Sequence, residues 1–423
     1  MTTLFNYLLR NKEKSFDDMY FNEVDLLLIN ELSYFPLDHY VTNSFDVAQA
    51  FTLSKLAQVL GPSLPRLHQY QSLILTRDRI ELFNIMANSI RYSNIKLYAF
   101  YNQISIDIEL QFSALCFDIP NQYTLVAFRG TDDSIIGWKE DAYMAFQQVI
   151  PAQQMAADYL NAMPIKNDKP ILLSGHSKGG NLAVYAASQA NIELQNQIQV
   201  IFSFDGPGFQ PQINNTQQMQ AICRKLIHII PEDSIVGMML EHNVPALVIK
   251  SRNSAFVQHD PINWIIVDNH FEVIDSVSDF SRLVDLTIKE WTNQLNEEDM
   301  KRFIDIIFDL IDQTQIQRLE EINQNKVSFF RSFFTYMNAL DVESRQFIDE
   351  IVMQLVQIFR NLFKEYRNQS LVDMKDKAIQ WFKPITFLEY FTTNFPSLIN
   401  KEEEISIPVK PQNQPIDNEQ EEV

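Results

Sequence analysis

Ser177 is the residue whose neighbours point most directly to chemistry. It lies in the segment ILLSGHSKGG, where Gly175, Ser177 and Gly179 form a GxSxG pattern between a strand-like run and a helix-like run. This order is the context of a nucleophile elbow, a strained turn that exposes the serine hydroxyl, and the glycines let strand and helix approach closely. The alternative is a glycine-rich turn that binds phosphate through its amides or has no function. We take Ser177 as the candidate nucleophile.

A serine hydroxyl needs a general base, and histidine is the usual one. We prefer His259, because FVQHDPINW is a polar interruption after the strand-like ALVIK and can carry the ring over the edge of a sheet. His242 and His270 are alternatives, although surface or packing roles are more frequent for such residues. His228 lies inside the strand-like LIHII and is expected in the core. His176 directly precedes the serine and is expected to pack or hydrogen bond under the turn.

Two aspartates are candidates for the acid that orients the histidine. Asp233 follows the strand-like LIHII, which is the usual place for the acid in proteins with a nucleophile elbow. Asp205 comes at the end of the strand-like IFSF, and this strand is the one that follows the helix after the serine. We place Asp233 first and keep Asp205 as the alternative; the other carboxylate would structure a loop.

An oxyanion also needs hydrogen-bond donors. One is expected from the backbone N–H of Lys178, at the start of a helix whose dipole favours negative charge. The other is expected from Thr131 in FRGTDD, which offers an N–H and a hydroxyl. A plain turn is the alternative for this segment.

The elements that must position these residues follow from the glycines and the hydrophobic periods. Eight of the nine glycines lie between Gly130 and Gly237, so the tight turns are expected there and long helices after it. Alternating patterns from Ile95 predict β-strands that add an antiparallel edge, followed by strands alternating with helices. These features predict an α/β fold with a mostly parallel sheet, helices on both faces and a C-terminal helical subdomain. Helices are also expected over 22–33 and 44–60.

We expect four parts in the chain. Residues 1–70 form an N-terminal helical segment on the core, and residues 71–271 form the α/β core. Residues 272–400 form the helical subdomain, which shows helical apolar spacing. Residues 401–423 are acidic, contain prolines and are expected to be disordered.

The charge balance excludes some function classes. The 54 acidic and 34 basic residues give a net charge of −20, which opposes binding to nucleic acid and to anionic membranes. No transmembrane segment and no signal peptide are expected, and two cysteines exclude a disulfide framework. A cytoplasmic location is the expectation, and the oligomeric state is left open.

The pairing of VAFRGTDDSIIGWKED with LLSGHSKGGNLAVYAA resembles the class 3 lipases. Together with FSFDGPGFQ, IPEDSIVGMML and VQHDPINW, it is similar to a bacterial lipase-like family of α/β-hydrolases of unknown function. The resemblance covers about residues 22–271 and implies an α/β-hydrolase fold, with Ser177 as nucleophile and Thr131 in the oxyanion hole. Trp138 and Asp141 match the Trp-x-x-Asp element, which is structural in the lipases. Lys178 departs from the small residue or leucine usual there, and we expect it to bind an anionic group or to pair with an acid such as Asp205.

The leading hypothesis for function is a serine hydrolase that cleaves a lipid or other acyl ester through an acyl-enzyme, with no metal or cofactor required. A catalytically silent binding or scaffolding protein with the same fold is one alternative. A thioesterase or peptidase that uses the same triad is another, because triad chemistry is shared and only the pocket differs.

Overall fold

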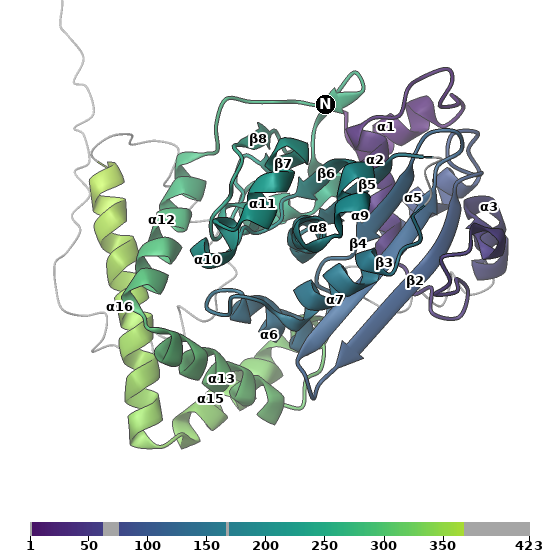
Figure 1. Cartoon of the computed structure of the whole chain (residues 1–423). Helices are drawn as coiled ribbons and strands as arrows, with labels where there is room; N and C mark the ends of the chain where they lie inside the picture. The colour runs from purple at the N-terminus through teal and green to yellow at the C-terminus, as the bar shows by residue number, and fades with distance from the viewer. Residues whose placement is uncertain (1, 62–75, 166–168, 368–423) are drawn as a thin grey trace, which may run out of the picture. The chain divides into compact units, whose positions relative to one another are not determined.

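The computed structural model describes residues 2–61, 76–165 and 169–367 (Figure 1). All of them belong to one compact unit of the chain, Met1–Ala378. The expected boundary at residue 70, the end of the helical subdomain at residue 400 and the expected disordered tail lie outside the described residues.

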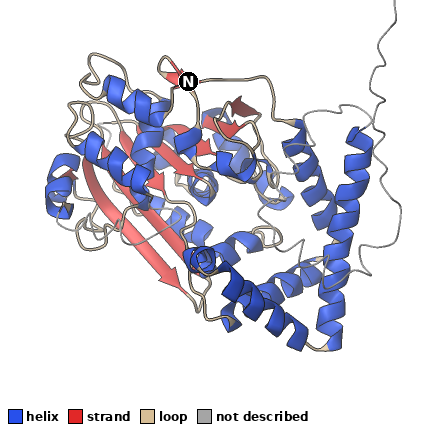
Figure 2. Cartoon of the chain, turned by 180° about the vertical axis from the view of Figure 1, so that it is seen from behind, coloured by secondary structure: helices blue, strands red, loops and turns tan. Residues whose placement is uncertain are grey.

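Within the described residues, eight strands form one sheet and lie side by side in chain order (Figures 1 and 2). The strands up to β4 pair antiparallel, and those from β4 to β8 pair parallel, so the predicted antiparallel edge on a mostly parallel sheet is confirmed. The strands are β1 (Phe51–Thr52), β2 (Lys96–Ser105), β3 (Leu110–Asp118), β4 (Thr124–Phe128), β5 (Ile171–His176), β6 (Ile198–Phe204), β7 (Leu226–Pro231) and β8 (Ala246–Ile249). Two short strands, β9 (Ile266–Val267) and β10 (His270–Phe271), form a separate pair.

The register brings the carboxyl ends of the parallel strands to one edge of the sheet. Phe128 of β4 pairs with Gly175 of β5, and His176 pairs with Phe204 of β6, which in turn pairs with Ile229 of β7. The residues that follow these strands therefore begin at the same level. Polar groups far apart in the sequence, at 129–131, 177, 205 and 233, can meet there.

The sheet separates two hydrophobic cores, and the alternation of side chains along a strand explains why. In β4, Leu125 and Ala127 belong to the core shared with the N-terminal helices, whereas Val126 and Phe128 face the other core. Right-handed crossovers between neighbouring parallel strands, all running in one direction, leave their helices on one face. The N-terminal segment supplies the cover for the second face. Helices therefore lie on both faces, as predicted.

The helices that cover these two faces are short. The N-terminal ones are α1 (Leu4–Asn11), α2 (Glu23–Asn30), α3 (Leu53–Leu60) and α5 (Arg77–Ala87), with 3-10 turns η1 (Glu31–Tyr34) and η2 (Val47–Gln49). Those that follow β4 are α6 (Ile135–Tyr143), α7 (Pro151–Asn161), α8 (Lys178–Gln189), α9 (Ile192–Gln197), α10 (Pro211–Asn214) and α11 (Gln217–Ile222), with 3-10 turns η3 (Cys223–Lys225), η4 (Val236–Met238), η5 (Ala255–His259) and η6 (Pro261–Asn263). Asn22 caps α2 as its sequence predicts, with its side chain accepting from the N–H of Val24 and of Asp25.

The continuous helix expected over 44–60 is wrong. Phe51 and Thr52 form β1 and pair with Leu97 and Lys96 of β2, so only α3 remains helical after the short turn η2. A sheet edge about 45 residues further along the chain decides the conformation of this segment, and local propensity cannot include such a partner.

The C-terminal region is helical, as predicted. It consists of α12 (Asp279–Gln294), α13 (Glu297–Gln313), α14 (Leu319–Gln324), α15 (Lys326–Ala339) and α16 (Val342–Arg367). Helices α12 and α16 pack against each other, and α13 contacts α6, α15 and α16. Along α16, Phe347, Ile351 and Leu355 follow each other at helical spacing; Ile351 is buried, while Phe347 and Leu355 are half-buried. No helix among the described residues is both long enough and apolar enough to cross a membrane.

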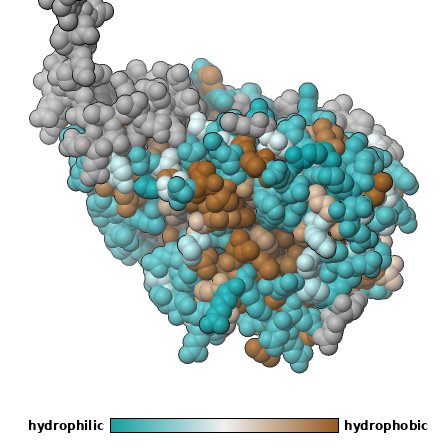
Figure 3. All heavy atoms as spheres, turned by 90° about the horizontal axis from the view of Figure 1, so that it is seen from above, coloured by the Kyte–Doolittle hydropathy of each residue, from teal (hydrophilic) through white to brown (hydrophobic). Residues whose placement is uncertain are grey.

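The surface is mainly hydrophilic on the face seen from above, and apolar residues gather near its middle (Figure 3). A chain with 46% apolar residues leaves some of them exposed, as globular proteins commonly do.

Candidate active site

Ser177 lies in a strained turn between β5 and α8. Its backbone φ is 57° and its ψ is −135°, a conformation that a residue with a side chain rarely adopts. The turn is held because the N–H of Ser177 donates to the carbonyl of Phe204 (2.9 Å) and its carbonyl accepts from the N–H of Gly180 (2.9 Å). Ser177 is half-buried, while residues 171–176 and 178–180 are buried. The strain therefore presents this side chain and no neighbouring one.

The two glycines of the motif are required by close backbone contacts. A Cβ at Gly175 would lie 2.0 Å from the carbonyl carbon of Gly179, and one at Gly179 would lie 2.1 Å from the carbonyl oxygen of Phe128. These distances are far below any van der Waals contact, so the first turn of α8 lies directly on β4 and β5. The expectation that the glycines allow close packing of strand and helix is confirmed.

His259 and Asp205 are brought together at the same edge. The Nδ1 of His259 donates to Oδ2 of Asp205 over 2.7 Å, although 54 residues separate them. Oδ1 of Asp205 accepts from Oγ of Ser234 (2.5 Å) and from the N–H of Gly237 (3.1 Å). With Nδ1 protonated, the neutral imidazole carries a lone pair on Nε2, which is the form that accepts a proton from a serine.

Asp233 occupies a different place. It lies in the turn after β7, where its N–H donates to Oε1 of Gln258 (2.9 Å) and its Oδ2 accepts from Nε2 of Gln258 (3.0 Å). These two bonds hold the residue that precedes His259. The preference for Asp233 over Asp205 does not match this geometry, because the carboxylate bonded to Nδ1 of His259 belongs to Asp205.

The backbone around His259 is fixed by two aromatic side chains. Nε2 of His176 donates to the carbonyl of His259 (2.7 Å), and the two rings contact each other in a tilted arrangement with their centroids 4.6 Å apart. Nδ1 of His176 must therefore accept, and its donor is the hydroxyl of Tyr34 (3.1 Å). Burial lowers the pKa of His176 well below its usual value, and the neighbouring charges of His259 and Arg79 add to this effect. Nε1 of Trp264 also donates to the carbonyl of Gln258 (2.8 Å). The expected role of His176 in hydrogen bonding under the turn is confirmed.

A buried arginine holds the other side of this loop. Nε of Arg79 contacts Oε2 of Glu31 (2.7 Å), and its Nη2 contacts Oδ1 of Asp260 (3.2 Å). Arg79 and Glu31 are 5% and 3% exposed, so their charges interact with little screening. Because Asp260 directly follows His259, the N-terminal helices take part in placing the imidazole. Sequence reasoning missed Arg79, Glu31, Tyr34 and Gln258; the only local signal was the polar cluster QHD around His259.

Thr131 lies beside the elbow. A Cβ at Gly130 would lie 3.1 Å from Cβ of Ser177, so the segment after β4 runs along the serine. The hydroxyl of Thr131 donates to Oδ2 of Asp141, the aspartate of the Trp-x-x-Asp element. Because the hydroxyl proton of Thr131 is already donated to Asp141, the amide N–H of Thr131 is the donor that could bind an oxyanion. The amide of Lys178 opens α8, where the first N–H groups have no acceptor within the helix.

The side chain of Lys178 is buried under the elbow. Its Nζ lies 2.9 Å from Oε2 of Glu140, 3.4 Å from Oδ1 of Asp141 and 3.0 Å from the carbonyl of Gln111. Burial alone would lower the pKa of this lysine, but the negative charges of Asp141 and Glu140 outweigh it and raise the pKa. Lys178 thus pairs with an acid, as expected, but the partners are Glu140 and Asp141 and not the suggested Asp205. The partners come from α6, which no local pattern around Lys178 reveals.

His228, His242 and His270 have contacts of their own in other places of the fold. His228 is buried in β7, with Nε2 on the carbonyl of Gly237 (3.1 Å) and Nδ1 facing Oγ of Ser203 (3.3 Å). Its ring stacks on that of His242 with centroids 4.1 Å apart. His270 is exposed and pairs with Glu23 (2.8 Å). His228 is thus the core residue that the sequence predicted.

The C-terminal helices are connected to the segment that follows Thr131. The N–H of Leu319 donates to the carbonyl of Asp133 (2.9 Å), and the N–H of Ile135 donates to the carbonyl of Gln317 (2.9 Å). Helix α13 also packs on α6, where Oδ1 of Asp305 accepts from the hydroxyl of Tyr143 (2.5 Å). The C-terminal region therefore supports the loop that is expected to bind the oxyanion.

Among the described residues, no three or more histidine, cysteine, aspartate or glutamate side chains lie together so that they could hold a metal ion. What the arrangement offers is a half-buried serine on a strained turn, a histidine bonded to a carboxylate, and helix-start amides. Such groups can transfer an acyl group.

The parallel sheet, the serine turn between β5 and α8, and the residues at the strand ends define an α/β-hydrolase fold. The sequence pattern of the Mbeg1-like family matches residues 86–309, more than half of the chain, and the chain therefore belongs to this family. No curated protein matches the chain.

Two solved structures with some similarity to this chain are lipases. The M37 lipase is 15% identical, with a TM-score of 0.32 over 52% of this chain and 70% of that one. The Rhizomucor miehei lipase propeptide complex is 14% identical, with a TM-score of 0.28 over 53% of this chain and 81% of that one.

Proposed function

We propose that this protein is a serine hydrolase that cleaves a lipid or other acyl ester through an acyl-enzyme. The observation that carries the proposal is the hydrogen bond between His259 and Asp205 at the edge of the sheet where the strained turn presents Ser177. The motifs further favour a bacterial relative of the class 3 lipases. Both cysteines, Cys116 and Cys223, are free, which is compatible with the cytoplasmic location that we propose.

In this mechanism Oγ of Ser177 attacks the acyl carbonyl while Nε2 of His259 takes its proton. Asp205 keeps Nδ1 protonated and stabilises the imidazolium. The amides of Lys178 and Thr131 donate to the oxyanion, and the imidazolium then gives its proton to the leaving alcohol. Water, activated by His259 in turn, releases the acid.

Asp233, Gln258, His176 and Arg79 have positioning roles in this proposal. Asp233 bonds to Gln258, His176 bonds to the carbonyl of His259, and Arg79 pairs with Asp260. Together these contacts fix where the imidazole lies. Lys178 contributes its amide to the oxyanion hole and its ammonium group to the packing of α6, which carries Asp141.

Labelling with a fluorophosphonate probe tests the proposal, because such probes react with activated serines only. We expect the native protein to be labelled and Ser177→Ala to lose the label. Ser188→Ala is the matched control: Ser188 lies on α8, and its Oγ donates to the carbonyl of Tyr185 (2.8 Å). This variant should keep the label. An unlabelled native protein would instead favour a binding protein that retains the fold.

A further inference from the structure

Asp205, the acid of the proposed triad, has a strained backbone conformation. Its φ is 48°, in the left-handed region that residues other than glycine seldom occupy. Its N–H donates to the carbonyl of Ile229 in β7 (2.7 Å), and its carboxylate accepts from Ser234 and Gly237 in the turn that follows β7. A strained residue keeps its conformation only where the surrounding structure holds it. The groups that fix this turn therefore help to decide where the carboxylate points.

Gly237 is the residue of this turn that lies directly against the carboxylate. Its N–H donates to Oδ1 of Asp205 (3.1 Å), and a Cβ added at Gly237 would lie 2.3 Å from the same oxygen. Glycine has more backbone freedom than any other residue. The N–H of Gly237 therefore keeps its direction only if the carbonyl of the same residue is also held.

His228 holds that carbonyl. Nε2 of His228 lies 3.1 Å from the carbonyl oxygen of Gly237 and must donate to it, so Nδ1 carries the lone pair and accepts from the hydroxyl of Ser203 (3.3 Å). Ser203 is the partner of His228 in the register of β6 and β7, and it lies two residues before Asp205. These contacts form a closed path from Asp205 through Gly237, His228 and Ser203 back to Asp205.

The ring of His228 is buried and packed on its face. It is 2% exposed, and the ring of His242 stacks on it with an angle of 19° between the two planes. Burial lowers the pKa of both histidines, so both rings are neutral at pH 7 and His228 keeps its donor on one side and its acceptor on the other. The ring is therefore a rigid, uncharged bridge between β6 and the turn.

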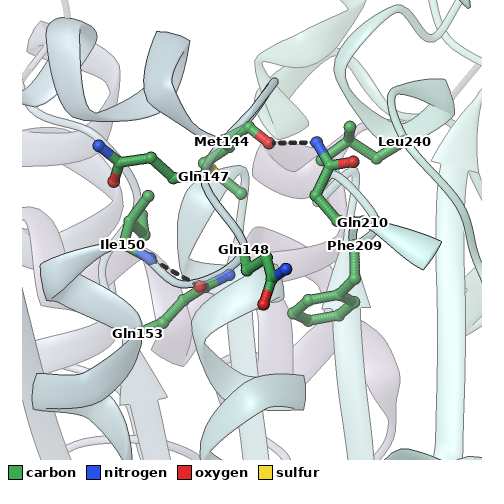
Figure 4. A pocket seen from close by; sticks show the side chains of 9 residues that line it. Met144, Gln147, Gln148, Ile150, Gln153, Phe209, Gln210 and Leu240 are labelled. Atoms are coloured by element: carbon green, nitrogen blue, oxygen red, sulfur yellow. Dashed lines mark hydrogen bonds between the residues drawn. The ribbon is translucent and has the colours of Figure 1, made fainter. Parts of the chain in front are cut away.

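The later part of the turn is anchored by other contacts. Residues 239–241 pair with residues 208–209 through backbone hydrogen bonds of 2.9 to 3.1 Å. Leu240 and Gln210 line one small pocket at the end of this pairing (Figure 4). None of these bonds involves position 228. A substitution there should therefore release the carbonyl of Gly237 without unfolding the turn.

We propose that His228 is a positioning residue for Asp205. The inference rests on the proposed function. The imidazole of His228 directs Gly237 so that its N–H binds Oδ1 of Asp205, which keeps Oδ2 on Nδ1 of His259. His228 itself binds no substrate and transfers no proton. Its loss should lower kcat with little change in KM, because the acid is displaced while the donors to the oxyanion stay in place.

Two amide side chains separate the roles of the two ring nitrogens. Glutamine reaches the place of Nε2 and can still donate to Gly237, whereas asparagine reaches only the place of Nδ1. With p-nitrophenyl butyrate, we expect His228→Gln to keep kcat within about threefold and His228→Asn to lower it by about tenfold, as for a lost orienting hydrogen bond. Native kcat in His228→Asn, or equal losses in the two variants, overturns the proposal. His228→Leu adds no buried polar group and is measured in place of His228→Asn if that variant does not fold.

A double-mutant cycle with Asp205→Asn tests whether the effect passes through the acid. In that background, His228→Asn should lower the remaining turnover by less than about twofold, because the carboxylate that Gly237 orients is already gone. A further tenfold loss would mean that His228 acts on catalysis by another route, and it overturns the positioning role.

Leu194→Ala is the matched control for stability. Leu194 is fully buried in α9, which precedes β6 and so lies at the other end of this strand from Asp205. This variant should lower the thermal midpoint and keep native kcat; a loss of kcat equal to that of His228→Asn would show that lower stability alone explains the effect. These outcomes in an active enzyme overturn the role of His228 alone. A native protein that neither reacts with a fluorophosphonate nor hydrolyses any ester overturns the proposed function, and this inference with it.

Discussion

Replacement of Asp205 by asparagine separates the two candidate acids. Asparagine has nearly the same shape as aspartate, but an NH₂ group replaces one of the two carboxylate oxygens. In one orientation this NH₂ group faces His259, and in the other it faces Ser234 and Gly237; at both positions the carboxylate of Asp205 accepts hydrogen bonds. If the NH₂ group faces Nδ1 of His259, the ring must place its proton on Nε2 and cannot take the proton of Ser177. If the amide is turned, its NH₂ group faces the N–H of Gly237, which then loses its acceptor.

The size of the effect follows from these contacts. Leaving the N–H of Gly237 unpaired in a buried site costs about 1 to 3 kcal/mol. Losing the charged hydrogen bond to the imidazolium costs about 1.5 to 3 kcal/mol more. The sum of about 2.5 to 6 kcal/mol corresponds to a decrease in kcat of roughly 10²- to 10⁴-fold at 1.36 kcal/mol per factor of ten.

Asp233→Asn is the matched control, because Asp205 and Asp233 are both buried, at 0% and 1% exposure. An asparagine at position 233 can keep its carbonyl oxygen toward Nε2 of Gln258, so we expect kcat to fall by less than about tenfold. Turnover of p-nitrophenyl butyrate is the assay, with the thermal midpoint of each variant recorded to show that it is folded. A loss of 10³-fold in Asp233→Asn beside near-native Asp205→Asn would refute the assignment of the acid.

Two further predictions concern buried charges. Lys178→Met leaves Glu140 and Asp141 without their cation and should lower the free energy of unfolding by about 3 to 5 kcal/mol in urea titrations. Adding Glu140→Gln should recover part of the loss, and a fully stable single variant would contradict the charge argument. Burial lowers the pKa of His228 below its usual value of about 6.5, so the unfolded chain binds more protons below that pH and stability falls as the pH decreases from 7 to 5. His228→Gln should reduce this slope by up to about 1.4 kcal/mol per pH unit, and parallel curves for both proteins would show that His228 does not contribute.

Local sequence patterns were sufficient for the strands, the elbow and most helices. Alternation of apolar residues predicted β2, β3 and β4, and short apolar runs predicted β5 through β8. The glycines around Ser177 predicted a turn in which strand and helix backbones nearly touch. These features depend on the residues within a few positions of each site, because backbone sterics and side-chain periodicity are local. Asn22 as a helix cap belongs to the same class.

Such local patterns could not predict contacts between residues that lie far apart in the sequence. The strand at Phe51 exists because β2 lies beside it, and Lys178 is neutralised by Glu140 of a helix that starts some 40 residues earlier. Charge counts identify lysines and carboxylates, but only the packing of α6 on β3 decides that Glu140 and Asp141 meet Lys178.

The chain alone thus predicted that Ser177 lies in a tight turn between a strand and a helix, and that a histidine and an aspartate that could serve it follow later in the chain. Only the tertiary structure decided that Asp205 accepts a hydrogen bond from Nδ1 of His259, while Asp233 accepts one from Nε2 of Gln258. The physical reason is that both aspartates end strands at one edge of the sheet. Their distance to the imidazole depends on the path of the loop over 250–264. Arg79 and His176 fix this loop from two other parts of the fold, and Trp264 fixes it from within.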